Sequence, residues 1–191
     1  HEDYSGVDND VFTLGSHGSG MLTQIATALS GGRMMGIAPD AKVLPVRVGS
    51  HSWSDSLGRC DVGGVNELAM AAGIKYAATF SPDIIVSAMD PNPRGGHVLK
   101  AIQDAVSDGA VYINGAGNSG YSEHHWLEAV DPVVLVGGAS QWDTRWDDGV
   151  GATSCGPFVS VSARAAGLKI AVPWGVRYDT QSGTSFAGPI V

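Results

Sequence analysis

The sequence is short of positive charge and of long apolar runs. Its 191 residues carry 11 lysines and arginines against 19 aspartates and glutamates, a formal net charge of −8 at pH 7. Nucleic-acid-binding surfaces concentrate lysine and arginine, so this balance argues against a nucleic-acid partner. No uncharged run approaches the roughly 18 apolar residues that a membrane helix needs, and we expect no membrane segment in this sequence.

Cysteine is almost absent as well, with Cys60 and Cys155 as the 2 examples. They lie far apart and form no Cys-x-x-Cys motif, so a cysteine-ligated zinc site is not expected. One disulfide and two separate thiols both remain open.

What the sequence does have is 43% hydrophobic residues, in a length typical of one domain. Apolar, β-branched runs alternate with helical patterns over residues 1–191. This alternation predicts a single three-layer α/β domain, with a mostly parallel sheet covered by helices on both faces. The strands are expected at 42–48, 84–88, 111–113, 133–137 and 159–161, and the helices at 21–29, 65–76 and 98–106.

A serine near the end of the sequence lies in a position that suits a catalytic nucleophile. Ser185 follows Gly183 and Thr184 and opens an apolar run, a pattern typical of a helix start. Free backbone N–H groups at such a start favour negative charge on a bound carbonyl oxygen. Because Ser and Thr are also common helix N-caps, an ordinary capped helix is the alternative for this segment taken alone.

Two other segments supply complementary groups. His17 opens an apolar helical pattern, so its imidazole can face a cleft. Asn118 ends the turn Gly115-Ala116-Gly117 after a β-prone run, and its carboxamide can donate to an oxyanion. Sites in parallel sheets form at the carboxyl ends of strands, which is where this turn is expected.

Four segments, in this order, resemble the subtilisin-like serine proteases, or subtilases. Residues 17–20 are similar to the His-Gly-Thr-His block of that family, and 36–41 to its Gly-Val-Ala-Pro-x-Ala block. Residues 115–118 are similar to Ala-Ala-Gly-Asn, and 183–189 to Gly-Thr-Ser-Met-Ala-x-Pro. The likeness runs through nearly the whole sequence.

The resemblance implies a subtilisin-like fold and the hydrolysis of peptide bonds by a serine endopeptidase. Ser185 would be the nucleophile, His17 the general base and Asn118 the oxyanion donor. It also implies a peptide or protein substrate, with a propeptide or an inhibitor as further partners, and it favours secretion.

The same resemblance implies an aspartate ahead of the histidine, in an Asp-Ser/Thr-Gly motif that this sequence does not contain. Residues 1–4 resemble the segment that follows this aspartate in the family. We therefore expect a fragment truncated at both ends, with the aspartate upstream and the fragment alone inactive or nearly so. Asp3, Asp8 and Asp10 could replace it, but no apolar strand precedes them, and a solvated acidic loop is the expected structure.

The resemblance places substrate-binding residues on two segments. Ser87, Ala88 and Met89 lie where the family has a strand that pairs with the substrate and lines its specificity pocket, and the turn 115–117 lies opposite. Met89 replaces a glycine, and it either narrows that pocket or fills a gap in the core. Residues 49–64 are predicted to be an insertion or an altered loop.

No metal site is predicted, although calcium remains open as a cofactor. The loop 30–33 offers no carboxylate or carboxamide ligand, and the acidic residues at 8–10 and at 143–148 are expected to hold only water. His124 and His125 are adjacent and are expected on the surface.

Three other functions compete with the protease. Residues 115–120 spell the Gly-x-Gly-x-x-Gly of dinucleotide sites but lack the acid after the next strand. Ala187 breaks the Gly-x-Ser-x-Gly of α/β-hydrolase esterases. The remaining alternative is a catalytically silent subtilase-like binding or scaffolding module, because Gly20, Thr23 and Ile190 depart from the family near the site.

Overall fold

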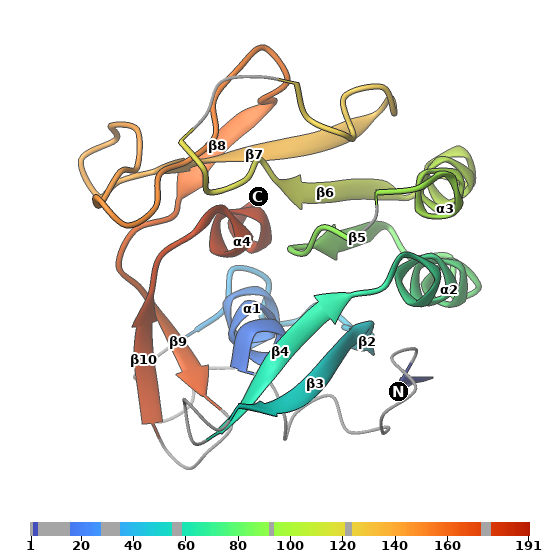
Figure 1. Cartoon of the computed structure of the whole chain (residues 1–191), viewed down its shortest axis with the longest axis horizontal. Coiled ribbons are helices and arrows are strands. Elements are labelled where there is room, and N and C mark those ends of the chain that lie inside the picture. Colours follow the sequence, from blue (N-terminus) through green and yellow to red (C-terminus); the bar gives the residue numbers. More distant parts are fainter. Residues whose placement is uncertain are drawn as a thin grey trace.

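Four parallel strands form the central sheet, in the order β5-β6-β7-β8 (Figure 1). Three of them are short, mostly apolar runs, as expected for a parallel sheet that is covered on both faces, whereas β8 is a mostly exposed edge strand that contains a serine and an arginine. The computed structural model describes residues 2–3, 16–27, 35–54, 59–91, 94–120, 124–172 and 177–191. The strands of this sheet are β5 (Ile84–Ser87), β6 (Val111–Gly115), β7 (Val133–Ala139) and β8 (Val161–Arg164).

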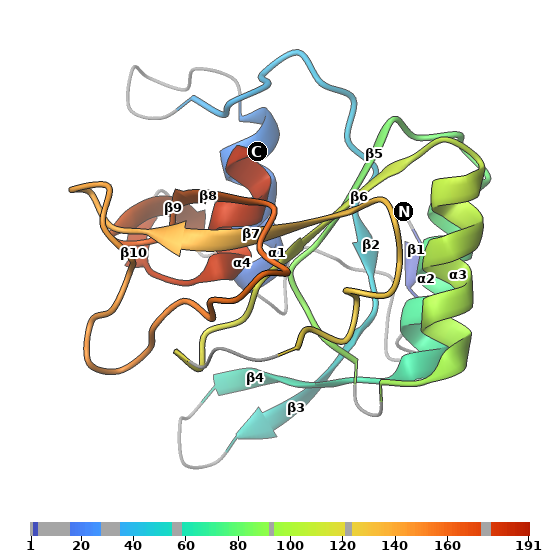
Figure 2. The same cartoon turned by 90° about the horizontal axis from the view of Figure 1, so that it is seen from above.

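Two helices precede β5 in the chain, one lies between β5 and β6, and one follows β8. Helices α2 and α3 pack side by side, at the right of Figure 2. Their first turns are joined by Glu67, whose Oε1 accepts a hydrogen bond of 2.9 Å from the backbone N–H of His97. The helices are α1 (Ser16–Ala26), α2 (Glu67–Ala78), α3 (Gly96–Ser107) and α4 (Thr184–Ala187), which continues as the 3₁₀ turn η1 (Gly188–Ile190).

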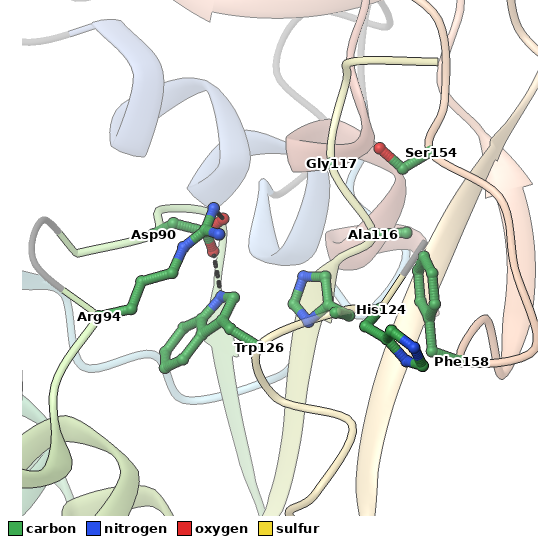
Figure 3. Close-up of a pocket in the computed structure, with 9 residues that line it drawn as sticks. Asp90, Arg94, Ala116, Gly117, His124, Trp126, Ser154 and Phe158 are labelled. Atoms are coloured by element: carbon green, nitrogen blue, oxygen red, sulfur yellow. Dashed lines mark hydrogen bonds and ion pairs between the residues drawn. The ribbon is translucent and has the colours of Figure 1, made fainter. Parts of the chain in front are cut away.

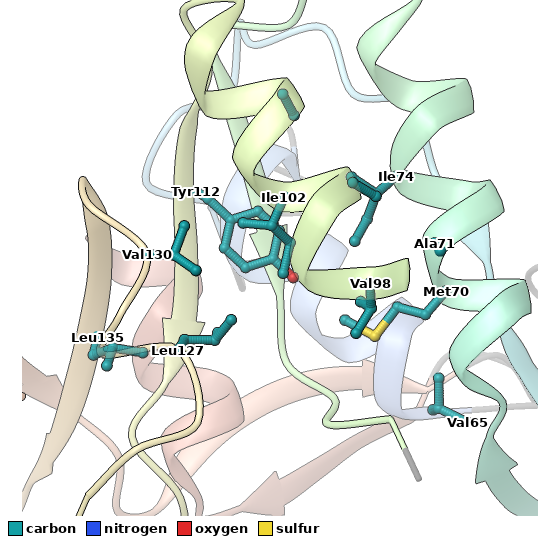
Figure 4. Packing of buried hydrophobic residues seen from close by; sticks show 12 residues of the cluster. Val65, Met70, Ala71, Ile74, Val98, Ile102, Tyr112, Leu127, Val130 and Leu135 are labelled. Atoms are coloured by element: carbon teal, nitrogen blue, oxygen red, sulfur yellow. The ribbon is translucent and has the colours of Figure 1, made fainter. Parts of the chain in front are cut away.

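Neighbouring residues of β6 belong to different cores. Tyr112 packs in a cluster with residues of α2 and α3, whereas Ile113 packs with Ala187 of α4. Successive side chains of a strand point to opposite faces of the sheet, so these helices cover opposite faces and the predicted three-layer α/β fold is confirmed. The larger cluster contains Val65, Met70, Ala71, Ile74, Val98, Ala101, Ile102, Ala105, Tyr112, Leu127, Val130 and Leu135 (Figure 4).

The predicted strand at 42–48 is wrong over most of its length. Only β2 (Val46–Arg47) is a strand, and it pairs with β1 (Glu2–Asp3). Pro45 immediately precedes it, and a proline cannot donate a hydrogen bond to a neighbouring strand. The side chains of Val43 and Leu44 are consequently more than a third exposed, at 38% and 37%.

Two antiparallel hairpins were not predicted. The segment 49–64, expected as an insertion or loop, folds as β3 (Gly49–Ser54) paired with β4 (Arg59–Val65). The second hairpin joins β9 (Leu168–Val172) and β10 (Arg177–Gln181). The strands of the first are rich in glycine and polar residues, so they lack the apolar run that identifies the strands of the central sheet.

Two smaller features of the fold concern the helices and one of the cysteines. None of the helices in the described ranges is long and apolar enough to cross a membrane. Cys155 is a free, partly buried cysteine.

Candidate active site

Three elements hold the predicted catalytic groups. His17 lies in the first turn of α1, as predicted, Asn118 lies in the turn after β6, and Ser185 is the second residue of α4. Hydrogen bonds join the turn after β6 to α4, and a ring contact joins α1 to α4.

The carboxamide of Asn118 is held from one side by Thr184. Its Oδ1 accepts hydrogen bonds from the backbone N–H and the hydroxyl of Thr184, at 2.8 and 2.9 Å. A backbone N–H can only donate, so the oxygen of the carboxamide must face Thr184 and the NH₂ group must face away. None of the described residues accepts a hydrogen bond from this NH₂ group, which leaves it available to a ligand.

The Thr184 hydroxyl connects two parts of the turn. Besides donating to Asn118, it accepts a hydrogen bond of 3.1 Å from the backbone N–H of Gly117. Thr184 is 2% exposed, so a buried residue determines where the Asn118 carboxamide lies.

Two glycines allow α4 to approach the end of β6. A Cβ at Gly115 would lie 2.8 Å from Thr184 Oγ1 and 3.0 Å from the Thr184 backbone. Gly183, the N-cap of α4, has a φ of 152°, in a region that residues with side chains rarely adopt. A larger residue at 115 would therefore push against Thr184, and one at 183 would strain the backbone at the start of α4.

The Ser185 hydroxyl donates a hydrogen bond of 3.2 Å to the carbonyl of Ala88, in the segment after β5. Among the described residues, no hydrogen bond joins Ser185 Oγ to His17. Catalytic hydrogen bonds are often long or misaligned before substrate binds and tighten only in the complex. The two side chains therefore lie on adjacent elements without forming the pair that catalysis needs.

His17 packs against the residue that follows the serine. Its ring centroid lies 5.4 Å from that of Phe186, with the planes inclined by 58°. Burial lowers the pKa of His17 below its usual range, so the imidazole is neutral near pH 7 and can accept a proton. Gly20 allows this packing, because a Cβ there would lie 3.4 Å from Phe186 Cε1 and 2.6 Å from Ile170 Cδ1.

A pocket of about 120 Å³ opens beside the turn after β6 (Figure 3). Ala116 and Gly117, two of the predicted substrate-binding residues, form part of its wall. The other lining residues were not predicted, because they come from separate segments that only the fold brings together. They are Asp90, Arg94, His124, His125, Trp126, Ser154 and Phe158.

The Asp90 carboxylate accepts hydrogen bonds from three side chains around this pocket. Its Oδ1 accepts from Trp126 Nε1 at 3.0 Å and from Asn114 Nδ2 at 3.3 Å, and its Oδ2 accepts from Arg94 Nη2 at 3.0 Å. Figure 3 shows Asp90, Arg94 and Trp126 on one side of the pocket and Phe158 on the other.

The two adjacent histidines have different environments, so the expectation that both lie on the surface is half wrong. His124 is exposed and contacts Glu128 at 2.7 Å. His125 is only 8% exposed, and its Nδ1 accepts a hydrogen bond of 3.2 Å from the backbone N–H of Leu127. Burial lowers the pKa of His125, and its ring stays neutral 5.6 Å from that of Phe158.

The other predicted substrate-binding residues lie along β5 and just after it. The Ser87 hydroxyl donates to the carbonyl of Met89 at 3.2 Å. The side chain of Met89 packs against the cluster of α2 and α3, as the gap-filling interpretation expects. Ser87 pairs with Asn114 in the sheet register, which puts the two predicted substrate-binding segments side by side.

Several acidic candidates give no site. Asp8, Asp10 and the loop 30–33 lie outside the described residues, as does the side chain of Asp3. No group of three or more possible metal ligands occurs in the part of the chain that the structure describes. In the acidic loop, the Asp148 carboxylate accepts hydrogen bonds from the backbone N–H groups of Val150 and Gly151, which lower its pKa.

Comparison with known proteins places this geometry in context. The model of the subtilase family matches residues 1–191. The thermophilic serine proteinase of Bacillus sp. (strain AK1) is 28% identical over 193 residues, which cover 98% of this chain and 44% of that protein. Thermitase of Thermoactinomyces vulgaris is 26% identical over 181 residues, which cover 93% of this chain and 57% of that protein.

Solved structures agree in fold. Sphericase superposes with a TM-score of 0.77 at 22% identity, over 98% of this chain and 66% of its own. A cold adapted subtilisin-like serine proteinase gives a TM-score of 0.75 at 23% identity, over 98% and 62%. The chain spans about half the length of the curated relatives it matches.

Proposed function

The chain belongs to the subtilase family, and on this basis we propose that it is a serine endopeptidase that hydrolyses peptide bonds through an acyl-enzyme on Ser185. His17 takes the proton of the Ser185 hydroxyl as this oxygen attacks the substrate carbonyl. The same imidazole then gives the proton to the leaving amine. Water hydrolyses the acyl-enzyme in a second step of the same kind.

The observation that carries this proposal is the orientation of the Asn118 carboxamide. With its oxygen held by Thr184, its NH₂ group is left to donate to a tetrahedral oxyanion. The backbone N–H of Ser185 is the second donor, since N–H groups in the first turn of a helix lack intrahelical partners. Donors already in place when charge develops stabilise the transition state without reorganisation.

The Ser185 hydroxyl must turn from Ala88 toward His17 for the first step. A neutral His17 favours this movement, because its ring can accept the hydrogen bond. We propose that the aspartate that orients His17 comes from a segment ahead of residue 1, since the sequence lacks the Asp-Ser/Thr-Gly motif. Without it, residues 1–191 alone would have little activity.

The substrate is a peptide or a protein, and a propeptide or an inhibitor would bind in the same way. The segments 87–89 and 115–117 lie beside each other at the carboxyl ends of β5 and β6. An extended substrate chain can pair with the segment 87–89 as an added strand, and its side chain next to the scissile bond can enter the pocket beside Gly117.

Fluorophosphonate labelling of the full-length protein tests the proposal. The wild type is compared with Ser185→Ala and His17→Ala, and the labelled peptide is identified by mass spectrometry. Ser107→Ala is the matched control, because Ser107 ends α3 shortly before the start of β6, whereas Asn118 follows the end of that strand. We expect label on Ser185 in the wild type and in the control variant, and none in the other two.

Two results would count against a protease. Label on another serine would remove Ser185 from the role of nucleophile. No label on a folded, propeptide-free protein would favour the catalytically silent binding or scaffolding module, in which Ser185 remains bonded to Ala88.

A further inference from the structure

The pocket beside the turn after β6 lies next to the reacting groups. Gly117, which lines it, donates to the Thr184 hydroxyl and directly precedes the oxyanion donor Asn118. If the chain is the protease proposed above, the side chain that enters this pocket precedes the scissile bond, and the pocket determines which bonds are cut.

Asp90 and Arg94 bring opposite charges into this pocket. Arg94 Nη2 contacts Asp90 Oδ2 at 3.0 Å, with the two side chains 56% and 31% exposed. Trp126 and Asn114 hold the other carboxylate oxygen independently of Arg94. The carboxylate therefore has two neutral donors that would keep it in place if Arg94 were removed.

Among the described residues that line the pocket, Asp90 is the one carboxylate and Arg94 the one guanidinium. His125 is buried and neutral, and His124 points its ring nitrogen to Glu128 outside the pocket wall, at 2.7 Å. Trp126 and Phe158 supply flat apolar surface, and the small residues Ala116 and Gly117 leave room for a large side chain.

We propose that the Asp90–Arg94 pair makes this a neutral, aromatic-walled specificity pocket, in which Arg94 masks an acidic site. The pocket takes a large uncharged side chain, such as phenylalanine, tyrosine or leucine. A lysine or arginine of the substrate is repelled by Arg94, the more exposed partner, and a glutamate that approaches Arg94 is repelled by the Asp90 carboxylate, which lies 3.0 Å from the guanidinium. Neither sign of charge is therefore favoured.

Removing either partner should unmask the other. In Arg94→Gln, the carboxylate stays bonded to Trp126 and Asn114 and becomes free to pair with a basic side chain. In Asp90→Asn, the carboxamide oxygen can keep the bonds from Trp126 and Asn114, while Arg94 becomes free to pair with an acidic side chain. Because both charges are partly exposed, we expect a change of roughly tenfold in preference, at the lower end for charge-assisted hydrogen bonds.

The experiment measures kcat/KM of the full-length protein on peptides that differ only at the residue before the scissile bond: phenylalanine, leucine, glutamine, lysine and glutamate. The wild type should prefer phenylalanine and leucine. Arg94→Gln should raise the lysine-to-phenylalanine ratio, and Asp90→Asn the glutamate-to-glutamine ratio. Lys100→Gln is the matched control, because it breaks the Lys100–Asp104 pair of 2.9 Å, which has the same i,i+4 spacing on the exposed face of α3.

A binding measurement separates this inference from the proposed activity. Calorimetric titration of benzamidine, a flat cation, into the Ser185→Ala protein requires no catalysis. The affinity should rise roughly tenfold when Arg94→Gln is added, and it should not change with Lys100→Gln.

Each pattern of results decides one question. If no peptide is hydrolysed but benzamidine binding rises as expected, the proposed activity fails and the masked acidic site stands. A wild type that prefers lysine, arginine or glutamate would overturn the inference, and so would an Arg94→Gln variant that behaves like Lys100→Gln in both measurements.

Discussion

Thr184→Val tests whether the buried hydroxyl of Thr184 positions the oxyanion donor. Valine has nearly the shape of threonine, so the change removes one oxygen and little else. That oxygen takes part in two hydrogen bonds, one to Asn118 Oδ1 at 2.9 Å and one from the Gly117 N–H at 3.1 Å. The backbone N–H of residue 184 still donates to Asn118 in the variant.

The expected cost in stability follows from these two bonds. Losing the bond to Asn118 costs about 0.5–1.5 kcal/mol, and leaving the partly buried Gly117 N–H without an acceptor costs about 1–3 kcal/mol. Because Gly117 borders the pocket and water can reach it, we expect about 2 kcal/mol in total.

The expected cost in activity falls on kcat. Loss of a whole oxyanion donor lowers kcat by about 10²–10³, a value measured on a subtilisin. In Thr184→Val the Asn118 carboxamide keeps one of its two anchors, so we expect a loss of roughly tenfold in kcat with KM little changed. Thr184→Ser keeps the hydroxyl and should retain most of the activity.

A double-mutant cycle separates this role from general loosening of the site. Peptide hydrolysis and urea unfolding are measured for Thr184→Val, for Asn118→Ala and for the pair. If Thr184 acts through Asn118, its substitution should have almost no further effect on kcat once Asn118 is alanine. Full additivity of the two losses in kcat, or unchanged kcat in Thr184→Val, would refute the reasoning.

Two further predictions concern Gly115 and the buried histidines. Gly115→Ala places a Cβ 2.8 Å from Thr184 Oγ1, so it should destabilise the protein by about 1–3 kcal/mol in urea unfolding and lower kcat, whereas Gly96→Ala, with nothing within 4 Å, should do neither. Folded His17 and His125 have pKa values lowered from 6.5, so unfolded chains bind more protons as the pH falls from about 7 to 5 and stability should decrease. The melting temperature measured over this range should fall toward pH 5, and less steeply in His125→Gln; a flat or rising profile would contradict the assigned burial of these rings.

Most of the central sheet could be predicted from the sequence, for a physical reason. Strands β6 and β7 are largely buried between helices, so each must be a short apolar run, and β5 is a partly buried apolar run beside them. Helix α3 ends shortly before Gly109, which has a φ of 106°. Because glycine adopts such a φ readily, its position in the sequence indicated where this helix ends. The family blocks likewise placed His17, Asn118 and Ser185 on the correct kinds of element.

The remainder depended on contacts between distant segments. The hairpin of β3 and β4 is a pairing of polar, glycine-containing strands, which no apolar periodicity marks. The strand predicted at 42–48 failed because apolar residues alone do not supply a partner strand. The hydrogen bonds from Trp126 and Asn114 to Asp90 join segments more than twenty residues apart, so no local sequence pattern predicts them.

The bond between Glu67 and the start of α3 has a consequence for how this chain can change over generations. The Glu67 carboxylate occupies the space that a side chain at Gly95 would need, while its oxygen accepts from the His97 N–H. A side chain at position 95 would therefore push the flexible end of Glu67 aside, and this movement deprives the His97 amide of its acceptor. The effect of a substitution at position 67 or 95 consequently depends on which residue occupies the other position.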